Sequence, residues 1–170
     1  MLDTLRTITN YISDVQDLLG RVEPGEIAAA ADLLYTAWQH GRRVLFMGNG
    51  GSSSSVSHIV NDLQKNIFLE AGKPLKALCL SDSTPLLMAW ANDTEWSNVF
   101  APQVACWAEP GDVVIGVSGS GNSMNVIQGM EAAKRSGATT LGLAGFDGGV
   151  LRSSVDRCIV VRSNNMQHIE

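Results

Sequence analysis

From residue 43 onward, short apolar runs alternate with stretches of helical periodicity, and this alternation constrains the fold more than any other feature of the sequence. The apolar runs, rich in Val, Leu and Ile, occupy residues 43–47, 75–80, 112–117, 139–144 and 158–161. Helices are predicted between them at residues 53–66, 84–91, 96–107 and 124–136. Strands that alternate with helices form right-handed βαβ units, whose parallel sheet is covered on both faces. The sequence therefore predicts a three-layer α/β sandwich with a mostly parallel, five-stranded sheet.

Two further helices are predicted ahead of the first strand. Apolar residues recur at helical spacing from Leu2 to Leu19, which indicates an amphipathic helix that ends near Gly20. A second helix is predicted over residues 25–40. A chain of 170 residues is long enough for one hydrophobic core and short for two. We therefore expect one domain, residues 1–170, made of a helical pair (1–40) and an α/β core (41–170).

The composition excludes several classes of partner. The net charge is −5, whereas a protein that binds nucleic acid needs a basic face for the phosphate backbone. No apolar stretch approaches the roughly 20 residues of a membrane span. The N-terminus also lacks the basic segment and apolar core of a signal peptide. We expect a cytoplasmic protein with neither a nucleic acid nor a membrane as partner.

The three cysteines are Cys79, Cys106 and Cys158, which lie far apart and form no CxxC pair. This spacing is not that of a disulfide framework or of a thiolate zinc site. We expect buried thiols in a reducing compartment.

Two glycine- and serine-rich loops, residues 48–52 and 118–123, each follow an apolar strand and precede a helix. Glycine permits positive φ and close approach of the backbone, and the helix N-terminus that follows presents unpaired N–H groups. Serine hydroxyls add further donors. Such loops can hold a phosphate dianion without lysine or arginine, and the alternative is that they are only tight turns. Ligands of parallel sheets bind at the carboxyl ends of the strands, where both loops lie.

Other phosphate and hydrolase motifs fail at particular residues. A dinucleotide fingerprint needs glycine at the position of Ser53, and the Gly-Lys-Ser/Thr of a Walker loop is absent. A nucleophile elbow around Ser118 needs glycine at the position of Ser120. The serines are therefore interpreted as phosphate donors, and no nucleotide cofactor is expected.

Residues 118–123, Ser-Gly-Ser-Gly-Asn-Ser after an apolar strand, resemble the phosphosugar-binding signature of SIS (sugar isomerase) domains. Residues 49–52, His58, Asn92-Asp93 and residues 144–149 are similar to the phosphoheptose isomerase branch of that family. The resemblance covers nearly the whole chain and implies a flavodoxin-like fold. It also implies a homotetramer with its sites at subunit contacts, and zinc, which some members bind.

The resemblance also implies a set of site residues. The residues that would line the sugar-phosphate site are Asn49, Gly50, Gly51 and Ser52, and those that would grip the phosphate are Ser118, Gly119, Ser120 and Ser123. Asn92 and Asp93 would contact the sugar chain, and Gln167 would contact both substrate and metal.

His58 and Asp62 are spaced i and i+4 on the helix after the first loop, so they share one face. They are candidate catalytic residues, as an acid/base pair, and candidate metal ligands together with Gln167. The alternative is a hydrogen bond on the helix surface. In the family the position of Asp62 carries the catalytic and metal-binding glutamate, so the side chain here is one methylene shorter.

A closing C-terminal helix is also implied, with a catalytic histidine about two turns after the position of Gln167. This chain ends at Glu170, and residues 164–170 resemble only the first turn of that helix. The expected core therefore lacks the closing helix. His168 is expected to be a surface residue.

The function that the resemblance implies is an aldose–ketose isomerase, with proton transfer between C1 and C2 through an enediol. The implied pair is D-sedoheptulose 7-phosphate and D-glycero-D-manno-heptose 7-phosphate. Two alternatives stay open: a non-catalytic or regulatory phosphosugar-binding protein, and a SIS enzyme for another sugar phosphate or amino-sugar phosphate.

Overall fold

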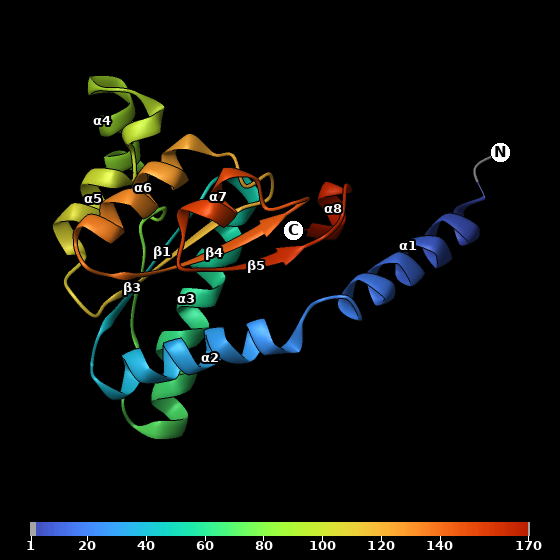
Figure 1. The fold of residues 1–170 in the computed structure, drawn as a ribbon, viewed down its shortest axis with the longest axis horizontal. Helices are drawn as coiled ribbons and strands as arrows, with labels where there is room; N and C mark the ends of the chain where they lie inside the picture. The colour runs from blue at the N-terminus through green and yellow to red at the C-terminus, as the bar shows by residue number, and fades with distance from the viewer. Residues whose placement is uncertain (1–2, 170) are drawn as a thin grey trace.

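The computed structural model describes residues 3–169, and residues 1, 2 and 170 of the predicted domain lie outside it (Figure 1). One sheet contains five strands: β1 (Arg43–Gly48), β2 (Lys76–Cys79), β3 (Val113–Ser118), β4 (Thr139–Gly145) and β5 (Arg157–Val161). Their order is β2-β1-β3-β4-β5, and each strand is parallel to its neighbours. The predicted five-stranded parallel sheet is confirmed.

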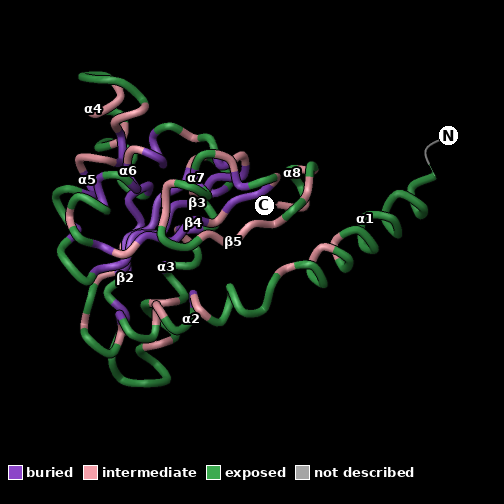
Figure 2. The backbone as a smooth tube through the Cα atoms, in the orientation of Figure 1, coloured by how far each residue is buried: buried purple, intermediate pink, exposed green. Residues whose placement is uncertain are grey.

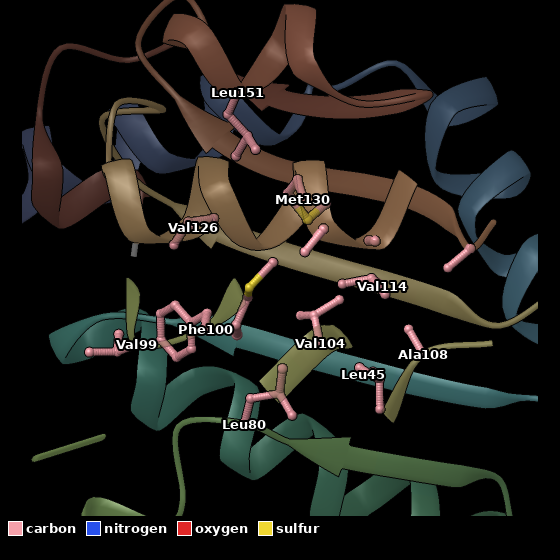
Figure 3. Close-up of a cluster of buried hydrophobic side chains, with 14 of the residues drawn as sticks. Leu45, Leu80, Val99, Phe100, Val104, Ala108, Val114, Val126, Met130 and Leu151 are labelled. Atoms are coloured by element: carbon pink, nitrogen blue, oxygen red, sulfur yellow. The ribbon is translucent and has the colours of Figure 1, made fainter. Parts of the chain in front are cut away.

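Helices cover both faces of this sheet, so the predicted three layers are confirmed as well. The helices of the α/β core are α3 (Gly50–Ala71), α4 (Thr84–Asp93), α5 (Ala101–Trp107), α6 (Met124–Arg135), α7 (Gly149–Ser154) and α8 (Met166–Ile169). Side chains of α3 pack with Val44 and Phe46 of β1 against one face. Side chains of α5, α6 and α7 pack with Leu45 and Met47 against the other (Figure 3). Successive residues of a strand point to opposite faces, so β1 is apolar throughout because both of its faces are buried.

Close approach of α6 to the sheet depends on two glycines. A Cβ on Gly116 of β3 would lie 2.8 Å from Cγ1 of Val126, and a Cβ on Gly129 of α6 would lie 2.5 Å from Sδ of Met47. A larger side chain at either position would push the helix away from the strands. These contacts fix the start of α6, and with it the end of the loop at residues 118–123.

The two N-terminal helices are confirmed as α1 (Thr4–Leu19) and α2 (Pro24–Gln39), and α1 is capped by Gly20 as expected. α2 packs on the body through Ala30 and Ala37. α1 buries none of its residues and extends away from the sheet (Figures 1 and 2). Its apolar stripe is therefore open to solvent within one chain.

Two predicted helices differ in their bounds, and one helix was not predicted. The helix predicted at residues 53–66 begins earlier, at Gly50, because Gly50 takes a φ of +52° that lets the chain turn directly into α3. The single helix predicted at 96–107 is divided into a 3-10 turn, η1 (Trp96–Asn98), and α5. Pro102 in the first turn of α5 explains the break, because proline cannot continue a preceding helix. The helix α7 was not predicted from the sequence.

The three cysteines are all free, but the expectation that they are buried is wrong for Cys106, which lies exposed near the end of α5. Burial raises the pKa of the Cys79 thiol to about 11. Because the thiolate is the reactive form, we expect a water-soluble maleimide at about pH 8 to label Cys106 rapidly in the native protein and Cys79 only after unfolding. Mass spectrometry of the labelled peptides measures both rates.

The variant Cys106→Ser is the control, since it should remove the rapid phase and leave the slow ones unchanged. Equal labelling rates for Cys79 and Cys106 in the native protein would contradict the burial of Cys79.

In residues 3–169 no helix is both long and apolar enough to cross a membrane.

Candidate functional site

The two glycine- and serine-rich loops lie next to each other at the carboxyl edge of the sheet. One connects β1 to α3 and the other connects β3 to α6, and β1 and β3 are neighbours in the sheet, with Gly48 beside Val117. The sequence alone predicted this edge for both loops but not their adjacency, which depends on the order of the strands. A ligand held by one loop is therefore within reach of the helix that follows the other.

The loop at residues 118–123, named the anion loop here, has five of its six carbonyl groups bonded within the protein. The carbonyl of Gly119 accepts the N–H of Gly145 at 2.9 Å, and the carbonyl of Gly121 accepts the N–H of Leu151 at 2.8 Å. The carbonyl of Ser120 accepts Nδ2 of Asn122 at 3.0 Å. With the acceptors occupied, the loop presents donors to a ligand.

Five backbone N–H groups of this region donate to no described group of the protein, and they belong to Gly119, Ser120, Ser123, Met124 and Asn125. The hydroxyls of Ser118 and Ser123 lie 2.9 Å apart. Ser123 is the N-cap residue of α6, yet its side chain makes no capping hydrogen bond. Unpaired N–H groups at a helix N-terminus bind anions, so the geometry is that of a phosphate site without a basic side chain.

The connection from β4 to α7 contacts the anion loop and is hydrogen-bonded to it. Gly121 has a φ of +67°, and a Cβ on it would lie 2.1 Å from the carbonyl oxygen of Gly148. Phe146 in the same connection has a φ of +51°, which is unusual for a bulky residue. Oδ1 of Asn122 accepts the N–H of Val150 at 3.1 Å. Asn122 was not among the predicted site residues, although an asparagine between Gly121 and Ser123 is typical of a turn that needs side-chain support.

A cavity of about 270 Å³ opens beside the anion loop. Gly119 and Ala144 lie at its loop side, and Ser52 and Ser55 lie at the start of α3. The remaining lining is apolar and comes from α3, β3, β4, β5 and Ile169 of α8. The structure thus brings predicted residues of both loops to one cavity.

His58 and Asp62 pair on the exposed face of α3. Nε2 of His58 lies 3.3 Å from Oδ2 of Asp62, and the two side chains are 75% and 50% exposed. His58 borders a second, polar hollow with Ser57, Asn61 and Asp82. Asp62 lines neither cavity, and it is about 18 Å along α3 from Gly50, at 1.5 Å per residue. The pair is therefore available at the surface, more than three turns from the start of the helix.

Asn92 and Asp93 are not brought to the loops in this chain. They end α4, and Nδ2 of Asn92 donates to Oδ1 of Asp93 at 2.9 Å. Both are exposed, and they line neither the cavity beside Gly119 nor the hollow beside His58. α4 lies far from α8 in the view of Figure 1.

Gln167 and His168 lie in α8, against the N-terminal helix α1. The hydroxyl of Tyr11 donates to the carbonyl of Gln167 at 3.1 Å, while the side chain of Gln167 is exposed. The ring of His168 lies 4.9 Å from that of Tyr11, and its Nε2 is 3.2 Å from Nδ2 of Asn165. His168 is thus half-buried between partners, and is not the free surface residue that the sequence suggested.

A complete metal site is not present within the described residues 3–169, where no three His, Cys, Asp or Glu side chains come close enough to hold an ion. His58 and Asp62 can supply two ligands. Zinc takes about four, of which a catalytic site supplies about three from protein. The pair alone therefore supplies too few ligands for a zinc ion.

Comparison with known proteins now defines the class. The sequence model of the SIS domain matches residues 10–145, so the chain belongs to the SIS domain family. Within it the chain falls in the phosphoheptose isomerase branch. It is 34% identical to the phosphoheptose isomerase of Geotalea daltonii over 170 residues, which is 100% of this chain and 88% of the relative. It is 40% identical to the probable phosphoheptose isomerase of Thermoplasma acidophilum over 139 residues, which is 82% of this chain and 76% of the relative.

Solved structures agree with this assignment. A phosphoheptose isomerase from Francisella tularensis superposes with a TM-score of 0.90 at 27% identity, covering 99% of this chain and 91% of that one. The Vibrio vulnificus NanR protein, complexed with ManNAc-6P, superposes with a TM-score of 0.67 at 18% identity, covering 96% of this chain and 52% of that one. At that identity the second likeness shows the fold alone.

Proposed function

We propose that this chain is a sugar-phosphate isomerase that interconverts an aldose and a ketose. The observation that carries the proposal is the anion loop, where most carbonyls are bonded and five N–H groups of the region are free, together with the helix α3 that bears a carboxylate and an imidazole. The relatives named phosphoheptose isomerase support the same reaction class. Phosphate binding and proton transfer are the two requirements of this chemistry.

The substrate pair we propose is D-sedoheptulose 7-phosphate and D-glycero-D-manno-heptose 7-phosphate, because the relatives are named for a phosphoheptose. The anion loop holds the phosphate, so the far end of the sugar chain, with C1 and C2, extends away from it. The carboxylate of Asp62 removes the proton from one carbon and returns it to the other. His58, at 3.3 Å from Asp62, orients this carboxylate, donates a proton to the carbonyl oxygen as the enediol forms, and takes up the proton of the neighbouring hydroxyl as the new carbonyl forms.

The test is direct incubation with sedoheptulose 7-phosphate, followed by NMR for the appearance of the aldose. Turnover supports the isomerase proposal. Binding without turnover would instead support the regulatory alternative, which the exposed position of Asp62 outside the cavity favours. Turnover of an amino-sugar phosphate but not of the heptose would change the substrate and keep the reaction class.

Zinc is a further part of the proposal. His58 and Asp62 on α3 would supply two of its ligands, and Gln167 of α8 would have to approach them to supply a third. Elemental analysis of the purified protein measures the zinc content, which should be lower in His58→Ala than in the wild type.

We also infer a cytoplasmic location, because three free cysteines fit a reducing compartment.

We propose that the chain forms a homo-oligomer, a tetramer in the family pattern, in which α1 packs on a second copy. Leu5 and Leu19 of α1 are 76% and 70% exposed, which is costly for an isolated chain. An apolar groove of about 460 Å³ between α2 and α3, with Leu34, Trp38 and Ile67 in its lining, offers a matching surface. Assembly would also allow Asn92 and Asp93 to approach the site of another copy.

Placing charges on the stripe of α1 tests this arrangement. We expect the double variant Ile8→Asp and Ile12→Asp to be monomeric in sedimentation velocity, whereas the wild type sediments as a tetramer, because a buried unpaired carboxylate opposes association. Asn10→Asp, on the opposite side of α1, is the control and should remain tetrameric. A monomeric wild type would contradict the proposal.

A further inference from the structure

Two asparagine side chains join the start of α3 to the start of α6. Nδ2 of Asn49 donates to Oδ1 of Asn125 at 2.9 Å, and Nδ2 of Asn125 donates to Oδ1 of Asn49 at 2.8 Å. Oδ1 of Asn125 also accepts the N–H of Val126 at 2.9 Å. We name the reciprocal pair of Asn49 and Asn125 the amide clasp. It links positions that are 76 residues apart in the sequence.

Both side chains of the clasp are in unusual situations for asparagine, one because it is buried and the other because it does not cap its own helix. Asn125 is only 1% exposed, and an amide at that depth is costly unless it is hydrogen-bonded. Asn49 occupies the N-cap of α3, where asparagine commonly accepts an N–H of the following turn, yet it makes no such bond. The amide of Asn49 is thus committed to α6, which leaves the first N–H groups of α3 uncapped by this side chain.

The clasp is a direct hydrogen-bonded link between the start of α3 and the start of α6. Within the described chain, no other hydrogen bond joins residues 49–53 to residues 118–125. α3 carries His58 and Asp62, whereas α6 begins at the anion loop. The start of α3 is therefore held relative to the anion loop by its packing on β1 and by the clasp at the edge of the sheet.

We propose that Asn125 is a positioning residue, which with Asn49 holds the helix that bears Asp62 in register with the anion loop. It governs the rate of the proton transfer more than the capture of phosphate. Misplacement by about an ångström costs up to about 100-fold in a positioned reaction. The effect on turnover rests on the isomerase function proposed above, while the effect on the start of α3 does not.

The test is a double-mutant cycle with Asn49→Ala, Asn125→Ala and the double variant. We expect each single variant to lower kcat by about 10- to 100-fold, with the Kd for inorganic phosphate changed by less than about threefold. The double variant should be no slower than the slower single variant, because residues that act as one unit are not additive. If Asn125→Ala does not fold, Asn49→Ala carries the test, since Asn49 is only half-buried.

The control is Gln103→Leu, which removes another buried amide. Gln103 is 5% exposed, and its Nε2 donates to the carbonyl of Val99 at 2.7 Å, within α5 and outside the clasp. A merely structural role would lower Tm in both variants and leave kcat unchanged in both. A wild-type kcat in folded Asn125→Ala, fully additive losses in the cycle, or a loss of phosphate affinity as large as the loss in kcat would overturn the proposal.

Hydrogen exchange tests the clasp independently of the proposed isomerase activity. If the wild type shows no turnover at all, the isomerase function fails. Amide exchange at residues 53–56, whose N–H groups begin the hydrogen-bonded part of α3, still tests the clasp, and it should accelerate in Asn125→Ala but not in Gln103→Leu. Unchanged exchange in Asn125→Ala would overturn the clasp itself, whatever the activity.

Discussion

Replacing Gly121 with alanine is expected to abolish the binding of sugar phosphates. The backbone there has a φ of +67°, which alanine adopts only at a cost, and the new Cβ would lie 2.1 Å from the carbonyl oxygen of Gly148. Because that oxygen belongs to backbone, the loop must move. The strain and the overpacking together should lower the free energy of unfolding by about 2–4 kcal/mol.

The displacement also breaks the arrangement that makes the loop a donor site. The carbonyl of Gly121 would lose its bond from the N–H of Leu151, so an acceptor would turn toward the ligand. We expect an affinity for sedoheptulose 7-phosphate at least about 100-fold weaker than that of the wild type in calorimetric titration, which corresponds to nearly 3 kcal/mol.

Gly25→Ala is the matched control, since Gly25 lies in α2 with ordinary φ and a Cβ there would meet nothing within 4 Å. It should bind like the wild type and be equally or more stable, because alanine favours a helix over glycine. Wild-type affinity in Gly121→Ala would show that the phosphate is not held by the anion loop.

Asp62→Asn is expected to lower kcat by about 10²- to 10⁴-fold, the range for loss of a general base. The amide has the same shape as the carboxylate but does not accept the proton, so KM should change by only a few-fold. Progress curves followed by NMR for wild type and variant give both constants.

Two variants make this result specific. Glu70→Gln removes a carboxylate from the same helix at an exposed position two turns further on, and it should retain wild-type kcat. Asp62→Glu introduces the glutamate that the family resemblance implies at this position, and it should retain or raise the activity because it keeps a carboxylate and lengthens its reach. Full activity in Asp62→Asn would assign the base to another residue.

The predictable part of the fold lies in the local pattern of the chain. Each strand of a parallel sheet is buried on both faces, so it is read as a short, continuous apolar run, and residues 43–47 and 112–117 became β1 and β3 for that reason. The loops were predictable too, because a strand that turns at once into a helix with free N–H groups needs glycine. The i, i+4 pairing of His58 and Asp62 followed from helix geometry alone.

Other elements were missed because local pattern does not report on them. The helix α7 has only six residues, too few for a clear period, and it is held by bonds to the anion loop such as that from the N–H of Leu151. The division of η1 from α5 follows from Pro102, because the helical spacing of apolar residues continues across this proline although the helix does not. The half-buried environment of His168 depends on Tyr11, 157 positions earlier in the chain.

The sequence by itself determined the class of fold, the family and the two loops, since each is encoded in residues that are adjacent or one helical turn apart. Only the tertiary structure decided which residues meet. It paired Asn49 with Asn125, packed Gly121 against Gly148, and left Asn92 and Asp93 away from the loops. The physical reason is the strand order β2-β1-β3-β4-β5, which places β1 beside β3 and β3 beside β4. That order arises from packing of the whole chain, and no periodicity within a segment encodes it.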